Sequence, residues 1–204
     1  MERSSFPHVL WSGRASRSTA AALRARVMER SSFMLDRRGL YSREPRRELS
    51  AVTYYRTPPR LQNVDYRLPR TYFLTFCVKD RARVFSDAVA AEIACKRIRQ
   101  FRNDGWYWLY AYCVMPDHVH MLMRAREKGV RLSRIVAMIR SAISHDVRRL
   151  TRDFAWQRGY HERIVREGDD SDAALAYALN NPFRASLVPA GEVYRFCGVV
   201  DQWR

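Results

Sequence analysis

Two runs of strand-forming residues, separated by a very short turn, dominate the centre of the sequence. Residues 106–115 read WYWLYAYCVM and residues 118–123 read HVHMLM, with only Pro116 and Asp117 between them. Apolar runs of this length joined by so few residues are typical of a β-hairpin, with Asp117 as a turn residue. The hairpin predicts an antiparallel sheet, because its two strands pair with each other directly. It also places His118 and His120 on one face, since residues two apart on a strand point the same way.

Further elements are expected on both sides of this hairpin, each marked by its apolar pattern or its flanking residues. In chain order they are a strand at 71–79, a helix capped by Ser86, a helix at 132–150, a strand at 155–166, and a helix at 172–180 that Pro182 stops. The resulting order is β-α-β-β-α-β-α. It predicts an α+β fold, a ferredoxin-like antiparallel sheet with helices on one face.

The charge of the chain points to an anionic partner. The sequence has 37 Lys and Arg against 21 Asp and Glu, a net charge of +16. Such an excess favours a nucleic acid, because basic side chains release the counterions of the phosphate backbone. No run approaches the ~18 apolar residues of a membrane span, and residues 9–11 are too short for the apolar part of a signal peptide. We therefore expect a cytoplasmic protein that does not interact with a membrane.

The cysteines and the N-terminal region complete this outline. Four cysteines are scattered without a Cys-x-x-Cys pair, which argues against a zinc finger and predicts reduced thiols in a cytosolic protein. Residues 1–66 are rich in arginine and lack a sustained apolar period, so we expect a flexible basic extension. The remaining chain is expected to form a folded domain at 67–190 and a C-terminal tail at 191–204.

The histidine pair leaves two interpretations open. A His-x-His strand can hold a divalent cation, but two ligands do not make a metal site, and such a pair can also be structural or solvated. A metal site would need a third ligand from elsewhere in the fold.

Three segments resemble the signatures of one known family, in the same order. They are residues 112–123 (YCVMPDHVHMLM), 156–166 (WQRGYHERIVR) and 177–188 (YALNNPFRASLV). They are similar to motifs of the REP-associated tyrosine transposases, relatives of the single-tyrosine HUH transposases. The last segment departs from the family pattern at Ser186, where a glycine is usual. The resemblance covers about residues 66–188.

The resemblance implies an HUH endonuclease fold and a metal-dependent enzyme. In this family a histidine pair holds Mg²⁺ or Mn²⁺, and a tyrosine attacks a phosphate of single-stranded DNA and becomes linked to its 5′ side. The matching residues are His118 and His120 for the metal, Tyr177 for the nucleophile, and Asn181 for a third ligand. The implied partner is single-stranded or hairpin DNA of repetitive palindromes, with a nucleoid-associated location and a monomer favoured over a dimer.

The chemistry of these residue types agrees with that role. A phenol has a pKa of ~10 and is a weak nucleophile at neutral pH, so a cation that stabilises charge on the phosphate matters more than proton removal alone. A phosphotyrosine link conserves the energy of the broken phosphodiester, which suits strand transfer. Tyr177 and Asn181 are spaced i, i+4 and share a helix face. Tyr177 could instead be a core aromatic residue, and Asn181 a helix C-cap.

Five arginines are candidates for DNA contacts: Arg140, Arg148, Arg149, Arg158 and Arg166. Three of them, Arg140, Arg148 and Arg149, are on the predicted helix at 132–150 and could equally form a solvated face. Two other functions also remain open. The chain could be a domesticated DNA-binding protein without turnover, or an HUH replication initiator or relaxase, although those usually carry three histidines or a second tyrosine.

Overall fold

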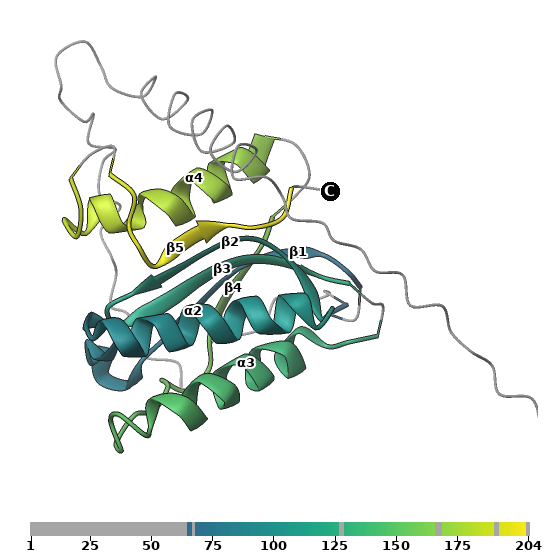
Figure 1. The fold of residues 1–204 in the computed structure, drawn as a ribbon. Helices are drawn as coiled ribbons and strands as arrows, with labels where there is room; N and C mark the ends of the chain where they lie inside the picture. Colours follow the sequence, from purple (N-terminus) through teal and green to yellow (C-terminus); the bar gives the residue numbers. More distant parts are fainter. Residues whose placement is uncertain (1–64, 67, 127–128, 166–168, 190–191, 203–204) are drawn as a thin grey trace, which may run out of the picture.

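The computed structural model describes residues 65–202, except 67, 127–128, 166–168 and 190–191. The expected N-terminal extension, residues 1–66, therefore lies almost wholly outside the described residues. The described chain is built on a five-stranded antiparallel sheet with the strand order β4-β1-β3-β2-β5 (Figure 1). The strands are β1 (Thr71–Cys77), β2 (Tyr107–Met115), β3 (His118–Ala125), β4 (His161–Val165) and β5 (Cys197–Val199). The predicted α+β ferredoxin-like fold is confirmed.

The hairpin predicted from the central run is formed by β2 and β3. Met115 pairs with His118 across the turn, so only Pro116 and Asp117 lie outside the strands. β3 is the central strand of the sheet, with β2 on one side and β1 on the other. Nearly all of the β2 and β3 residues are buried, because both faces of the sheet are covered.

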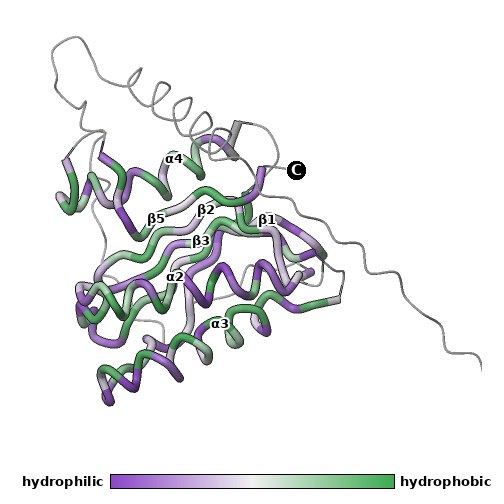
Figure 2. Tube along the Cα trace, viewed as in Figure 1, coloured by the Kyte–Doolittle hydropathy of each residue, from purple (hydrophilic) through white to green (hydrophobic). Residues whose placement is uncertain are grey.

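Helices cover both faces of the sheet, which corrects the expectation of helices on one face. Figure 1 shows α2 (Ala88–Asn103) and α3 (Leu132–Val147) on one face and α4 (Asp169–Arg184) on the other. The larger core lies between the sheet and the first two helices, whose apolar and polar residues alternate along their length (Figure 2). A smaller core joins Ala174, Leu175 and Ala178 of α4 to Tyr110 and Leu122.

Several predicted boundaries move by a few residues. α2 is capped by Asp87, whose Oδ1 accepts a hydrogen bond from the Ala90 amide at 2.8 Å, while Ser86 ends a short 3-10 helix, η2 (Val84–Ser86). The predicted helix end at residue 150 lies at Val147, and the strand expected at 155–166 is limited to His161–Val165. The predicted strand is too long because its apolar pattern begins in a loop whose Trp156 and Tyr160 pack on the core.

Pro182 does not stop α4, contrary to expectation, and the helix continues to Arg184. A proline removes one hydrogen bond from a helix. Here that loss does not interrupt α4, which runs through Pro182. The helix ends instead where Ser186 adopts a left-handed conformation (φ 55°). The Ser186 amide then donates to Phe183 and the Leu187 amide to Pro182, both at 2.9 Å, which closes the helix as a Schellman motif.

The expectation of four reduced thiols is wrong, because Cys113 and Cys197 form a disulfide. β5, in the tail for which no element was predicted, pairs with β2 and sets Cys197 directly opposite Cys113. A sequence separation of 84 residues hides this proximity in the sequence. Cys77 and Cys95 are free and buried. Among the described residues, no helix is long and apolar enough to cross a membrane.

Candidate active site

The two histidines meet on the α4 side of the sheet. His118 pairs with Cys77, and His120 with Thr75, so their side chains lie on the face opposite Tyr72, Leu74 and Phe76. His120 is only 6% exposed. The Nε2 atoms of the two rings are 3.0 Å apart and point at each other. The strand period therefore brings both imidazoles to one face, as the sequence predicts, and their Nε2 atoms meet there.

The remaining nitrogen of each ring is held by a polar neighbour. Thr75 Oγ1 lies 2.8 Å from Nδ1 of His120. Nδ1 of His118 lies 2.6 Å from Oδ1 of Asp117. Asp117 is thus a turn residue, as predicted, and also orients a histidine, which the sequence analysis did not assign. Partners of this kind fix ring orientation and tautomer in metal-binding histidines.

His120 is neutral at physiological pH. Burial, the neighbouring His118 and the Arg81 guanidinium together lower the pKa of His120 to about 3. A neutral imidazole keeps one nitrogen lone pair available for a cation. The Thr75 hydroxyl can donate or accept a hydrogen bond, so it satisfies His120 Nδ1 in either tautomer. The ring can therefore present Nε2 as a ligand without leaving a buried polar atom unpaired.

Tyr177 on α4 lies beside this pair. Its ring centroid is 6.1 Å from that of His120 and 5.5 Å from that of Phe73. The tyrosine is 44% exposed, so a ligand can approach this residue from solvent. The guanidinium of Arg184, two helical turns further on, lies 5.6 Å above the tyrosine ring. Arg184 was not among the predicted site residues.

Asn181 lies one turn after Tyr177 on the same helix. Its Nδ2 donates to the Tyr177 carbonyl at 2.8 Å. The side-chain oxygen makes no hydrogen bond with any described residue, which leaves the carbonyl oxygen as the donor atom that a hard cation would use. Its role as a ligand remains a prediction.

The histidine pair fits a divalent cation. Two ligands ~2.1 Å from an octahedral ion and at right angles are ~3.0 Å apart, which is the observed distance between the Nε2 atoms. Within the described part of the chain, no third His, Cys, Asp or Glu joins them. Among the described residues, the further ligands on offer are neutral oxygens, such as that of Asn181, and water and substrate phosphate would complete the shell of a hard cation.

Most of the predicted DNA-binding arginines do not lie near this pair. Arg140, Arg148 and Arg149 are on or just after α3, on the other face of the sheet. Arg140 donates to the carbonyls of Gln157 and Gly159, and Arg148 to that of Phe154, so both fasten the chain that follows α3. Arg158 is exposed. Arg166 lies outside the described residues. Their contact with DNA stays a prediction.

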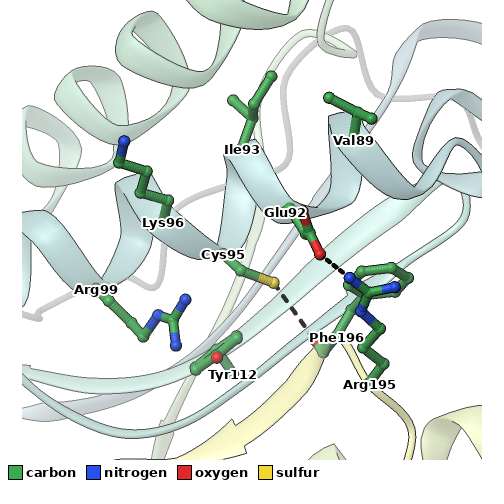
Figure 3. A pocket seen from close by; sticks show the side chains of 9 residues that line it. All are labelled: Val89, Glu92, Ile93, Cys95, Lys96, Arg99, Tyr112, Arg195 and Phe196. Carbon is green, nitrogen blue, oxygen red and sulfur yellow. Dashed lines mark hydrogen bonds and ion pairs between the residues drawn. The ribbon is translucent and has the colours of Figure 1, made fainter.

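A cavity of about 420 Å³ lies on this other side of the sheet, between α2 and the chain before β5 (Figure 3). Lys96, Arg99 and Arg195 line it together with Tyr112 and Phe196. Arg195 is paired with Glu92, and the Cys95 thiol donates to the Phe196 carbonyl. Tyr112 is adjacent to Cys113 and points away from the histidine face, so this cavity is separate from the site around His118 and His120.

Comparison with known proteins places these residues in a family context. The model of the family described as "Transposase IS200 like" matches residues 69–181, more than half of the chain. The matched segment contains the histidine pair, Tyr177 and Asn181.

Two curated proteins of Haemophilus influenzae are similar in sequence. One, named as a REP-associated tyrosine transposase, is 23% identical over 135 residues, which are 61% of this chain and 76% of that protein. The other is uncharacterized and 22% identical over 164 residues, covering 65% of this chain and 91% of its own. A solved structure of a REP-associated tyrosine transposase bound to a REP hairpin superposes with a TM-score of 0.52. It is 19% identical and covers 63% of this chain and 76% of that one, a likeness of fold.

Proposed function

Because this chain belongs to the IS200-like transposase family, we propose that it cuts and rejoins single-stranded DNA through a covalent bond to Tyr177. The observation that carries this proposal is the position of Tyr177, partly exposed and 6.1 Å from the ring of a buried, neutral histidine. A transposase is an enzyme, and an exposed tyrosine beside two neighbouring imidazoles is suited to attack a phosphate that those imidazoles help to hold.

The bond changes follow from the chemistry of a phenol. The Tyr177 oxygen attacks the phosphorus, the new O–P bond forms, and the bond between phosphorus and the 3′ oxygen breaks. The phenolic proton passes to solvent, and the leaving oxygen takes up a proton as a 3′-hydroxyl. The DNA is then attached to the protein by its 5′ phosphate, and attack by a 3′-hydroxyl can reverse the step. Phe73 packs against the tyrosine ring and limits its directions of approach.

The proposed cofactor is Mg²⁺ or Mn²⁺, held by His118 and His120 with the oxygen of Asn181. When bound there, such a cation polarises the phosphate and offsets the charge that develops on it. Thr75 and Asp117 hold the Nδ1 sides of the two rings, which leaves the two neighbouring Nε2 atoms as the proposed ligands.

The proposed substrate is a hairpin with a single-stranded end. This choice is supported by the net charge of +16 and by the REP hairpin in the structure of similar fold. Long-range attraction to phosphates would bring DNA to the protein, and the tyrosine would act on the strand that enters the site.

The experiment that tests this function is the capture of a covalent adduct. The protein is incubated with Mn²⁺ and a pool of DNA hairpins that carry a randomised single-stranded tail and a 3′ label. We expect a labelled protein–DNA adduct that survives SDS, and peptide mass mapping should place it on Tyr177. Tyr177→Phe removes only the hydroxyl and should lose both adduct and cleavage, with an unchanged Tm and unchanged DNA affinity.

The controls separate this mechanism from its alternatives. Tyr160→Phe should retain the adduct, whereas EDTA, His118→Ala or His120→Ala should abolish it while DNA binding stays within a few-fold. DNA binding without any adduct in the parent protein would identify a binding protein without turnover. Cleavage that persists in Tyr177→Phe without an adduct would indicate attack by water.

A further inference from the structure

Arg81 lies in a strained turn directly after β1. Arg81 and the preceding Asp80 have φ angles of 55° and 54° in the short 3-10 helix η1 (Lys79–Arg81). Left-handed conformations are unfavourable for residues other than glycine and tend to be retained at functional sites. The residues just before it are fastened to two neighbouring segments, because the Val78 amide donates to the Asp117 carbonyl at 2.8 Å and the Lys79 amide to the Ala155 carbonyl at 2.9 Å. The fold therefore holds this conformation in place.

The turn directs the Arg81 guanidinium to the edge of the histidine site. One terminal nitrogen lies 3.3 Å from Oδ2 of Asp117 and 3.3 Å from the sulfur of Cys77. Asp117 uses its other oxygen to hold His118, and Cys77 is the strand partner of His118. A single carboxylate thus separates the arginine from a proposed metal ligand.

Most of the hydrogen-bonding capacity of Arg81 is unused. Its side chain is 59% exposed, and among the described residues its Nε and second terminal nitrogen make no hydrogen bond. Arg140 and Arg148 differ in this respect, since backbone carbonyls occupy them on the other face of the sheet. A guanidinium with free donors, fixed at one corner by a carboxylate, is well suited to a phosphate, whose oxygens accept two parallel hydrogen bonds.

We propose that Arg81 binds a backbone phosphate of the DNA strand, next to the phosphate that Tyr177 attacks. The inference rests on the proposed function for the identity of the attacked phosphate. An exposed ion pair with Asp117 contributes little to folding, so that pair alone does not account for two strained residues. A DNA strand that crosses the histidine pair toward the Pro116–Asp117 turn would bring a second phosphate within reach of the free donors of Arg81. This arrangement would fix which bond of the strand faces Tyr177.

The test measures binding, so that it does not depend on cleavage. The tightest-binding hairpin of the randomised pool is prepared as a series in which one phosphate at a time is replaced by an uncharged methylphosphonate. Affinities are measured by fluorescence anisotropy in the Tyr177→Phe background, with Arg81 intact and with Arg81→Gln. Arg83→Gln is the matched control, because it removes the same charge from an exposed arginine two residues away.

We expect one replacement beside the attacked phosphate to weaken binding about ten-fold when Arg81 is intact, the loss typical of one charge-assisted hydrogen bond. Arg81→Gln should weaken binding of unmodified DNA by a similar factor and remove the penalty at that position only. Arg83→Gln should leave the whole pattern unchanged. Arg81→Lys, which keeps the charge but not the planar fork, should show a reduced penalty at the same position.

Two results would overturn the proposal. One is an unchanged pattern of penalties in Arg81→Gln, and the other is an equal loss of affinity in Arg81→Gln and Arg83→Gln. Thermal melting of each variant shows whether a loss arises from unfolding, and Arg81→Lys then supplies the comparison. A parent protein that forms no adduct would refute the proposed nicking function, while the binding series would still decide whether Arg81 contacts a phosphate.

Discussion

At the scale of single residues, the site depends on what lies behind the two imidazoles. The His-x-His spacing brings the rings to one face, but it does not determine where their nitrogens point. That direction comes from Thr75, a cross-strand partner 45 residues away, and from Asp117. Asp117 is adjacent to His118, so its role had a signal in the sequence. Thr75 had none, because its contact depends on the register of β1 and β3.

Replacement of Asp117 should weaken metal binding more than it weakens the fold. Asp117→Ala removes the acceptor that orients His118, and we expect the affinity for Mn²⁺ to fall about 10–100-fold, as is typical when such a partner is lost. Isothermal titration calorimetry measures this affinity directly. Asp117→Asn keeps an acceptor oxygen and should lose much less.

Asp80→Asn is a suitable control, because it neutralises a nearby exposed carboxylate that does not contact a histidine. Equal affinities in the parent and in Asp117→Ala would mean that the Asp117–His118 contact does not orient the ring for a metal.

At the scale of elements, α4 shows where pattern reasoning succeeds and where it fails. Both helices on the other face, α2 and α3, could be predicted, because their apolar stripes pack on a large core. The bounds of α4 could not, since the cost of a proline within a helix depends on whether the turns around it pack well. The contact of Tyr177 with the histidine pair was expected only from the resemblance to a known family. Nothing in the local sequence places one beside the other.

Ser186 has the least favourable backbone conformation at the C-terminal end of α4. It takes the left-handed position that closes the Schellman motif, and a side chain there costs ~1–2 kcal/mol relative to glycine. We therefore expect Ser186→Gly to raise the free energy of unfolding by about 1 kcal/mol in urea denaturation. This conformation also explains why a glycine is usual at the position in the family that the sequence resembles.

A second glycine substitution provides the control for Ser186→Gly. Ser141 is exposed in the interior of α3, so Ser141→Gly should lower stability by about 0.5 kcal/mol. If both substitutions lower the free energy of unfolding, the left-handed conformation of Ser186 does not destabilise the protein relative to glycine.

At the scale of the whole molecule, the two faces of the sheet have different roles. One face carries the large core under α2 and α3 and provides most of the buried apolar surface. The other carries the histidines under α4, where the apolar cluster is small and Tyr177 stays accessible. The sequence predicts the sheet but not the second covered face, because an apolar stripe on a helix does not specify the side of the sheet on which that helix packs. The C-terminal strand was missed for a related reason, since three residues carry too little pattern.

The link between β5 and β2 leads to a prediction for the whole chain. Cys113 and Cys197 close a loop across 84 residues, and cross-links of this kind typically add about 2–4 kcal/mol to the free energy of unfolding. We expect dithiothreitol to lower the stability of the parent by this amount in urea denaturation. The double variant Cys113→Ser, Cys197→Ser should have the lower stability with or without the reductant.

Thiol counting tests the same link independently of stability. Burial raises the pKa of Cys95 to about 12 and also raises that of Cys77, so neither thiol reacts readily in the folded protein. Alkylation is therefore carried out in denaturant, where mass spectrometry should find two modified cysteines without reductant and four with it. Four modified cysteines without reductant would show that Cys113 and Cys197 are thiols in the native protein. β5 would then be held to the sheet by its three backbone pairs and the packing around them alone.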